Sequence, residues 1–585
     1  MPSRRAFLAS SAAALACRPH GPATATPAPT PTAAPTPAPR DETAIDEATL
    51  AAAERIAGVR YDDRERAAVL AVIGAQLERA IRRRAATLPE SLAPATIFDP
   101  RVPGSPRGPA RESVAVRFDD VPLPADDEAI AFAPIATLGG WLRRGRITAV
   151  RLAELSLSRL REHGAALQCV ARTTDALALE QARAADRLLA RGRPLGPLHG
   201  IPWGCKDIID TAGIATSWGA EPFADRVPER DATVVERLAA AGAVLCAKLS
   251  TGALAYGDIW DGGVTRNPWN PNEGSSGSSA GPAAATAAGL VSFALGSETL
   301  GSIVSPSMRC GTVGLRPSFG RVPRGGAMPL CWSLDKLGPL TRSVQDAMWV
   351  LAAIHGADDR DPCARTVPLA FDASADASGM RIGFVPQWFP APGEPLERAA
   401  LDALRRRGAT LVELSPPTLP DAMPWDALLT PLLVEAAAAF EALTLSNRDD
   451  ALTWQGLQAW PNTFRAARFI TAIDLVNADR VRRAAMQQLH AWFEPVDAVV
   501  GPSFAEPMLL ATNATGHPCL VVRTGLRTRA PEPGTDGTPP ADATPRPCPH
   551  GVTLWGKLWD EGRLARAGMA IEAELGTASL RPPRP

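Results

Sequence analysis

The spacing of apolar residues alternates between the period of a helix and the unbroken runs of a buried strand. Val150, Ala153, Leu157 and Leu160 lie three or four positions apart, which predicts a helix with one apolar face. Short apolar runs without alternation are typical of strands covered on both sides. These patterns predict strands at 167–171, 243–247, 291–295, 381–385 and 409–414, and helices at 175–192, 234–242, 280–289, 343–355 and 394–407. We therefore expect an α/β fold with a sheet covered by helices on both faces.

The alternation begins near residue 127, and the chain before it is organised differently. Residues 42–88 are rich in Ala, Arg and Glu, with Leu70, Ile73, Leu77 and Ile81 at helical spacing, which predicts a pair of helices. Eight prolines between 88 and 126 predict a connection that wraps along a surface. We expect a helical extension and wrapping segment over 42–126 and one main domain over 127–580. The prolines of 526–550 predict a second irregular loop.

The first 41 residues have the features of an export signal and a spacer. A short basic start leads into an apolar stretch at 6–16, and the AxA pattern at 14–16 is typical of a signal-peptide cleavage site. The letters SRRAFL at 3–8 favour twin-arginine export, with ordinary secretion as the alternative. Residues 18–41 form a Pro/Ala/Thr tract that predicts an extended linker. We expect an exported, periplasmic or extracytoplasmic protein, held at a membrane only if Cys17 is lipidated.

Composition and charge narrow the classes of partner. The formal net charge is -1, so the chain has no overall positive field that would attract nucleic acid, and we expect no such partner. After residue 17 no apolar stretch is long enough to predict a membrane-spanning helix. The eight cysteines from Cys169 to Cys548 lack the spacing of a zinc site. We expect them to be buried free thiols, and we expect no metal and no cofactor.

Lysine is rare in this chain and therefore informative. There are four lysines, Lys206, Lys248, Lys336 and Lys557, beside 57 arginines. Arg stays protonated in proteins, whereas a Lys in a dry pocket can lose its proton and act as a base. Lys206 lies among apolar and Gly residues in the segment GIPWGCKD at 200–207, which suits that role. A structural Lys206 that pairs with Asp207 is the alternative.

A second segment, EGSSGSSAG at 273–281, places serines among glycines and so exposes hydroxyls and backbone N–H groups together. A phosphate-binding loop would need a Lys inside the GxxxxGK[ST] pattern, and this segment has none. Gly277 to Gly281 also fits G-x-S-x-G, which would make Ser279 the nucleophile of a Ser-His-Asp hydrolase. That turn requires a strand directly before it, and the two prolines in NPWNPNEG at 267–274 argue against one.

Taken together, these segments resemble the amidase signature hydrolases. The resemblance covers residues 131 to about 575 through GPLHGIP at 196–202, KD at 206–207, the Gly/Ser segment, CG at 310–311 with LRP at 315–317, SLDKLGP at 333–339 and TGHP at 515–518. It implies a single amidase signature domain with a central twisted mixed β-sheet. It also implies hydrolysis of a carboxamide through an acyl-enzyme intermediate.

The resemblance assigns roles to particular residues. In the family the nucleophilic serine follows the bridging serine by 24 residues, which identifies Ser302 as the nucleophile and Ser278 as the bridge. Lys206 is then the base, and the peptide bond before Ser278 is expected to be cis. The backbone N–H groups of Thr299, Leu300, Gly301 and Ser302 are expected to form the oxyanion hole. Leu300 departs from the family, which usually has Gly there, and would be strained if the position required a positive φ.

The remaining candidate residues are interpreted mainly as structural residues. His517 is expected to make a structural hydrogen bond, and Lys248 and Lys336 to bond carbonyl groups. Trp203, Trp332, Trp454 and Trp460 are either core residues or walls of an acyl pocket. The partner is expected to be a small-molecule amide, whose identity the sequence does not reveal, and the oligomeric state stays open. Esterase or aryl-acylamidase activity, or amide binding without turnover, are the alternative functions.

Overall fold

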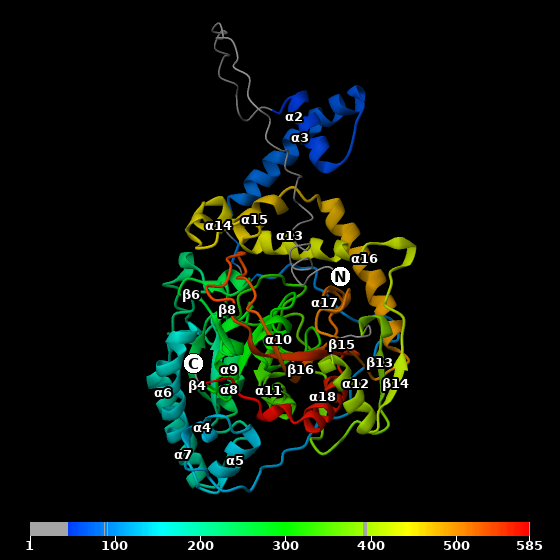
Figure 1. Cartoon of the computed structure of the whole chain (residues 1–585). Coiled ribbons are helices and arrows are strands. Elements are labelled where there is room, and N and C mark those ends of the chain that lie inside the picture. The colour runs from blue at the N-terminus through cyan, green and yellow to red at the C-terminus, as the bar shows by residue number, and fades with distance from the viewer. Residues whose placement is uncertain (1–44, 87, 90–91, 390–394, 584–585) are drawn as a thin grey trace.

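The computed structural model describes residues 45–86, 88–89, 92–389 and 395–583. The predicted signal peptide at 1–17, including Cys17, and the predicted linker at 18–41 lie outside the described residues. Figure 1 shows a main body built around a sheet, with the helices α2 (Glu47–Ala57) and α3 (Asp63–Arg84) above it.

The predicted α/β architecture is confirmed by an eleven-stranded mixed sheet within the described residues. The three strands β9, β3 and β4 pair in parallel, whereas the pairs from β15 to β9 are antiparallel. In spatial order the strands are β14 (Thr410–Glu413), β13 (Arg381–Phe384), β15 (Ala498–Pro502), β17 (Arg546–Gly556), β16 (Cys519–Arg529), β10 (Val313–Arg316), β11 (Lys336–Thr341), β9 (Phe293–Glu298), β3 (Pro202–Lys206), β4 (Val244–Leu249) and β2 (Val170–Thr173).

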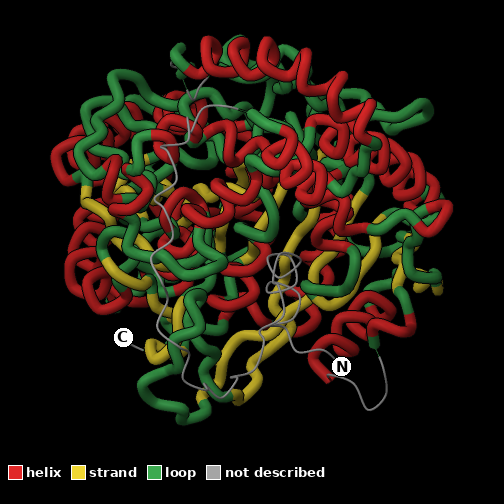
Figure 2. The backbone as a smooth tube through the Cα atoms, turned by 90° about the horizontal axis from the view of Figure 1, so that it is seen from above, coloured by secondary structure: helices red, strands yellow, loops and turns green. Residues whose placement is uncertain are grey.

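Helices surround this sheet, as the view from above shows (Figure 2). After α2 and α3 they are α4 (Asp127–Ala131), α5 (Ile135–Arg143), α6 (Ala149–Leu167), α7 (Asp175–Ala190), α8 (Thr233–Ala240), α9 (Ala280–Ala287), α10 (Val304–Cys310), α11 (Val344–Ile354), α12 (Pro395–Arg406), α13 (Thr430–Ala439), α14 (Glu441–Leu445), α15 (Trp460–Ala467), α16 (Ala472–Phe493), α17 (Met508–Ala514) and α18 (Glu561–Leu575). Three two-stranded ladders lie beside the main sheet: β1 (Ser113–Val114) with β12 (Ala370–Phe371), β5 (Ile259–Trp260) with β6 (Gly263–Val264), and β7 (Arg266–Asn267) with β8 (Asn270–Gly274).

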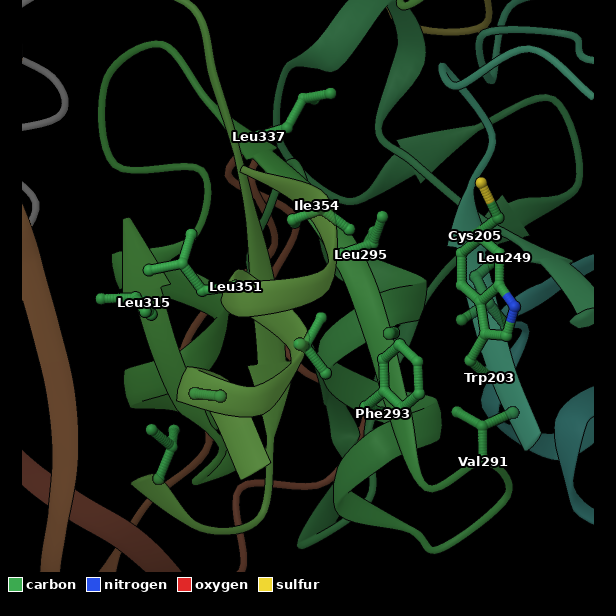
Figure 3. Close-up of a cluster of buried hydrophobic side chains, with 14 of the residues drawn as sticks. Trp203, Cys205, Leu249, Val291, Phe293, Leu295, Leu315, Leu337, Leu351 and Ile354 are labelled. Atoms are coloured by element: carbon green, nitrogen blue, oxygen red, sulfur yellow. The ribbon is translucent and has the colours of Figure 1, made fainter. Parts of the chain in front are cut away.

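The core lies between the sheet and its helices. Every residue of β4 and of β9 is buried, which is why both strands begin with an apolar run rather than an alternating pattern. Their polar residues, Lys248 in β4 and Ser297 and Glu298 in β9, lie toward the carboxyl ends of the strands. Trp203 of β3 stacks on Phe293 of β9 with ring centroids 5.9 Å apart. Figure 3 shows this pair with Leu351 and Ile354 of α11 and side chains from neighbouring strands. The same strands carry the candidate site at their ends.

The predicted elements match the observed ones in type, with shifts of a few residues at their ends. The strand predicted at 291–295 is β9, which starts at Phe293 and continues to Glu298. The helix predicted at 280–289 is α9, which ends at Ala287. The interpretation of 267–274 as unable to supply a central strand is also confirmed, because its strands pair only with each other.

The prediction of an irregular loop over 526–550 is wrong at both ends. Residues 526–529 continue β16, and residues 546–550 begin β17, so that the connection is only 530–545. Two prolines, Pro547 and Pro549, lie in this part of β17, opposite Thr528 and Leu526. They are tolerated because β15 pairs with β17 only from Val552 onward, which leaves one side of the strand without a partner strand.

The helical extension forms as predicted, and α2 buries Leu50 and Glu54, but α3 does not bury its apolar face. Asp62 and Glu65 make a reciprocal capping box at the start of α3, and Arg66 binds Glu54 of α2 at 2.9 Å. No residue of α3 is buried, and Ile81 is 55% exposed. The helix reaches the main body through an ion pair between Arg83 and Glu441 of α14. Charged contacts and caps therefore hold this extension, rather than a shared core.

Truncating the stacked pair should weaken the whole domain. We expect Phe293→Ala to lower the free energy of unfolding by about 3–5 kcal/mol, because it removes a fully buried ring and leaves a cavity between β3 and β9. Urea unfolding followed by circular dichroism measures the change. The matched control is Val227→Ala at a site that is 53% exposed, where a change within about 0.5 kcal/mol is expected. Equal effects of both substitutions would contradict this account of the core.

Candidate active site

Lys206 is the last residue of β3, and its side chain is completely buried. Its Nζ donates hydrogen bonds to three serine hydroxyls: Ser278 Oγ at 2.8 Å, Ser297 Oγ at 2.8 Å and Ser279 Oγ at 3.3 Å. Side chains alternate along a strand, so Lys206 points away from the face that carries Cys205. The parallel neighbour β9 brings Ser297 to the same level. The strand β3 therefore positions the amine of Lys206 among the hydroxyls of three serines.

Burial controls the charge of this amine. Removal from water lowers the pKa of Lys206 to about 7, although the more distant carboxylates Asp335 and Glu298 act in the opposite direction. Both carboxylates are engaged elsewhere, Asp335 with Thr299 at 2.6 Å and Glu298 with Arg316 at 2.7 Å. Near neutral pH a substantial fraction of Lys206 is therefore uncharged and can accept a proton.

The Gly/Ser segment passes directly over Lys206. The peptide bond between Gly277 and Ser278 is cis, as the resemblance implies. A Cβ on Gly277 would lie 1.8 Å from the carbonyl oxygen of Gly257, so only glycine fits there. Asp258 accepts a hydrogen bond from the N–H of Ser276 at 2.9 Å and so fixes the loop just before the bridge. Close backbone packing and one buried carboxylate thus position Ser278.

Ser279 is a structural serine in this arrangement. It is completely buried, and its hydroxyl donates to the carbonyl of Ser297 at 3.0 Å while accepting from the N–H of Ser297 at 3.1 Å. The strand that a G-x-S-x-G nucleophile needs is not there, since β8 ends at Gly274 and belongs to a separate ladder. The geometry therefore argues against Ser279 as the nucleophile.

Ser302 lies in the loop between β9 and α10, at the wall of a cavity of about 700 Å³. Gly277, Leu300 and Gly301 line the same wall, and Ser302 is 8% exposed. Its carbonyl accepts a hydrogen bond from the N–H of Ser279 at 3.1 Å. The structure thus brings Lys206 and Ser278 into direct contact. The hydrogen bonds among the described residues do not include one between the hydroxyls of Ser278 and Ser302, and this contact has to form in the reacting complex.

The loop before Ser302 lines the cavity and has backbone N–H groups that are not engaged by other described residues. Glu298 accepts the N–H groups of Ile303 at 2.8 Å and Val304 at 2.9 Å. Among the hydrogen bonds of the described residues, none is donated by the N–H of residues 300, 301 or 302. The predicted strain at Leu300 is not found, because the positive φ of this loop, +90°, falls on Gly301. Leu300 instead packs against the apolar cluster around Leu509.

A buried ionic network around Glu298 stabilises the loop that carries Ser302. Arg316 donates to Glu298 at 2.7 Å and to the carbonyl of His517 at 2.9 Å, and Asn513 donates to Glu298 at 2.8 Å. Burial alone would raise the pKa of Glu298, but the charges of Arg316 and Lys336 hold it below its usual value. The carboxylate therefore stays ionised and keeps the start of α10 in place.

The other candidate residues have the structural roles predicted for them. His517 exchanges a hydrogen bond with Thr515 at 2.8 Å, and burial lowers its pKa to about 3, so it is neutral at ordinary pH. Lys336 donates to the side-chain oxygen of Asn513 at 2.8 Å. Lys248 bonds the carbonyl of Ile209. Neither Lys248 nor Lys336 therefore contacts Ser278, whereas Lys206 does.

The 700 Å³ cavity has an aromatic wall and a wall from the β16–β17 connection. Trp454 lines it and lies 5.2 Å from Tyr256, ring centroid to ring centroid, and Phe504 also contributes to the lining. Trp203 and Trp460 are buried, and Trp332 lines a different cavity. The sequence therefore marked Trp454 as one of several possibilities but gave no signal for Tyr256 or Phe504.

The connection at 530–545 is tied to the Gly/Ser segment. Thr535 donates to Asp258 Oδ1 at 2.7 Å, while the other oxygen of Asp258 holds the N–H of Ser276. Arg529 forms an ion pair with the buried Glu273 at 2.6 Å. The same carboxylate, Asp258, therefore orients both the catalytic loop and the cavity wall, although sequence reasoning did not single it out.

Three general features of the described residues bear on the chemistry. All eight cysteines from Cys169 to Cys548 are buried and free, as predicted. In the described ranges, no His, Cys, Asp and Glu side chains form a group of three or more that could hold a metal ion. Where the structure is described, no helix combines the length and apolar character needed to cross a bilayer.

The chain is similar in sequence and in fold to several known proteins. A family model described as Amidase matches residues 151–564. The chain is 32% identical over 486 residues to the A-subunit of the glutamyl-tRNA(Gln) amidotransferase of Chloroflexus aggregans, covering 75% of this chain and 96% of that protein. It resembles the crystal structure of the native peptide amidase of Stenotrophomonas maltophilia with 30% identity and a TM-score of 0.66, covering 77% of this chain and 98% of that one. A bacterial aryl acylamidase, at 21% identity and a TM-score of 0.64, shares the fold, and this match covers 77% of this chain and 99% of that one.

Breaking the buried ion pair behind the loop should be costly. We expect Arg316→Met to lower the free energy of unfolding by about 3–5 kcal/mol, because it leaves the charge of Glu298 buried without its partner. Chemical unfolding measures the effect. The control is Arg405→Met, which removes an exposed pair with Asp402 and should change the stability by less than about 1 kcal/mol. An Arg316→Met variant as stable as the parent would show that the network does not hold the loop.

Proposed function

Because the chain belongs to the amidase family, we propose that it hydrolyses a carboxamide, a non-peptide or terminal amide, through Ser302, Ser278 and Lys206. The observation that carries this proposal is a completely buried amine, with a pKa lowered by burial to about 7, in hydrogen-bond contact with Ser278. Ser302 lines the cavity beside this pair. An uncharged amine in this position can serve as the base that a serine nucleophile needs.

Acylation begins with two linked proton transfers. Uncharged Lys206 takes the proton of the Ser278 hydroxyl, and Ser278 takes the proton of Ser302, whose Oγ attacks the amide carbonyl. Negative charge then develops on the carbonyl oxygen. The N–H groups of Leu300, Gly301 and Ser302, which line the substrate cavity, are the donors available to stabilise it, because Glu298 already occupies those of the next two residues. Thr299, the fourth residue expected in the oxyanion hole, lines the separate cavity that also contains Trp332.

The same groups complete the cycle in reverse. The proton held by Lys206 returns through Ser278 to the nitrogen of the leaving amine, and the C–N bond breaks. Lys206 is then uncharged again and can draw a proton from the water that attacks the acyl group on Ser302. Hydrolysis releases the carboxylic acid and restores all three side chains. No cofactor takes part in this scheme.

We propose that the substrate is a small-molecule amide and that the protein acts on it outside the cytoplasm. The aromatic side chains of Tyr256, Trp454 and Phe504 favour a substrate with an apolar group next to the scissile bond. The predicted export signal would bring the enzyme to its substrate outside the cytoplasm, away from the tRNA for which the Chloroflexus relative is named. Membrane attachment would require lipidation of Cys17.

Two alternatives use the same residues. Esterase or aryl-acylamidase activity would follow from the same nucleophile and base with a different leaving group. An inactive amide-binding protein is the other alternative, and the regular backbone of Leu300 removes the reason to suspect it.

A fluorophosphonate probe tests the nucleophile directly. We expect the label on Ser302, found by mass spectrometry of the digested mature protein. Lys206→Met and Ser278→Ala should slow labelling by at least about 100-fold, because each interrupts the proton transfer to the base. Ser279→Ala should retain the labelling site. A label on Ser279, or none on any serine of the parent protein, would contradict the proposal.

Activity should depend on pH in one direction. Only uncharged Lys206 accepts a proton, and its pKa is lowered by burial to about 7. We expect kcat/KM to rise with pH, to level off above about 7, and to fall about ten-fold per pH unit below it. Thermal melts at each pH identify losses caused by unfolding. A profile that is flat from alkaline to mildly acidic pH, with the protein folded throughout, would exclude Lys206 as the base.

A further inference from the structure

Lys206 lies between two cavities rather than at the end of one. On one side, Ser278 leads to the 700 Å³ cavity through Gly277 and Ser302. On the other side, Ser297 lines a second cavity of about 530 Å³. The two hydroxyls are bound to the same amine at the same distance, 2.8 Å.

The second cavity has both polar and apolar residues in its wall and reaches the molecular surface. Glu229 and Arg230, which are exposed, contribute to its lining. Deeper inside, the wall includes Arg324, Asp361 and Asp335. Arg324 is paired with Asp361 at 2.9 Å, and Asp335 is bound to Thr299, so the charges near Ser297 have partners. A cavity of this size that opens to solvent and has charged groups in its wall has room for water molecules.

Only one of the three hydroxyls around Lys206 leads to this water. Ser279 is completely buried, and its hydroxyl ends on the carbonyl of Ser297. Ser278 is 1% exposed and follows Gly277 of the substrate-cavity wall, on the side where the acyl group is attached once Ser302 has reacted. Ser297 retains 6% of its surface exposed and belongs to the wall of the second cavity. It is therefore the contact through which a proton on Lys206 can leave while the substrate cavity is occupied.

We propose that Ser297 is the proton outlet of Lys206 and connects it with the water of the second cavity. The inference rests on the proposed function, because it concerns the charge of the proposed base during turnover. In this step an N–H bond of the Lys206 ammonium breaks and an O–H bond to Ser297 Oγ forms. The original hydroxyl proton of Ser297 passes to a water molecule in the cavity, and Lys206 is left uncharged. No other reactant is needed.

The outlet matters for some leaving groups and not for others. An amine leaving group takes the proton from Lys206, so the base is uncharged again when water attacks. A 4-nitrophenolate leaving group departs without a proton. Lys206 then stays charged in the acyl-enzyme, and it has to lose that proton before it can activate water. Hydrolysis of a 4-nitrophenyl ester should therefore need Ser297 more than hydrolysis of the amide of the same acid.

The experiment compares these two substrates in the parent protein and in Ser297→Ala. For the ester we expect the burst of nitrophenolate to remain and the steady-state kcat to fall by at least about ten-fold, because deacylation waits for the proton. For the amide we expect a clearly smaller loss, at least about three-fold less than for the ester, because the amine takes the proton although Lys206 has lost one hydrogen-bond partner. Loss of a purely structural contact would lower both values together.

Two further measurements separate proton transfer from packing. Ser297→Thr keeps a hydroxyl and should restore ester turnover. In Ser297→Ala, raising the imidazole concentration at fixed pH should also restore it, since a small base that enters the second cavity can take the proton. Fluorophosphonate labelling confirms that each variant is folded and reactive.

The outcomes distinguish this inference from the proposed function. Equal losses for ester and amide, or no loss for either, would overturn the role of Ser297 and leave the amidase proposal standing. A parent protein that hydrolyses neither substrate and takes no label on Ser302 would overturn both.

Discussion

The site depends on one constraint, a lysine that is kept out of water without a carboxylate in contact with it. Lys206 is completely buried, and its three hydrogen-bond partners are hydroxyls. A carboxylate in direct contact would hold the proton on the amine and remove its value as a base. The acids whose charges act on it, Asp335 and Glu298, are both bound to other groups. Their hydrogen bonds stabilise the surrounding loops, while burial lowers the pKa of Lys206.

The fold meets this constraint by joining distant segments at the ends of two parallel strands. β3 ends at Lys206, and the neighbouring β9 supplies Ser297 and Glu298 before the chain turns into the loop of Ser302. The Gly/Ser segment crosses above them, fixed by the buried Asp258. Because Asp258 also holds Thr535, the wall of the substrate cavity and the bridging serine share one anchor. Substitutions in the 530–545 connection can therefore alter the position of Ser278 through Asp258, although the connection does not itself contact the reacting groups.

Parts of this arrangement could be predicted from the sequence because they are local or compositional. The scarcity of lysine drew attention to Lys206, and the resemblance to the amidase signature family, in which the two serines lie 24 residues apart, related Ser302 to Ser278. Asp258 and Ser297 could not be found in this way, since their roles arise from contacts between segments far apart in the chain. The start of β17 was missed because prolines argue against strands, and only the register shows that one side of this strand lacks a partner there. Likewise, the apolar spacing of α3 predicted a helix, but spacing alone does not reveal that none of its residues is buried in the folded protein.

The most direct test of the account is to measure the pKa of Lys206 itself. The chain has only four lysines, so nuclear magnetic resonance of protein labelled at lysine Cε gives few signals, and Lys206→Met identifies the one in question. The account predicts that this signal titrates near pH 7 in the folded protein. A titration near 10.5, the ordinary value for lysine, would mean that Lys206 is charged throughout the neutral range. That result would contradict its role as the base.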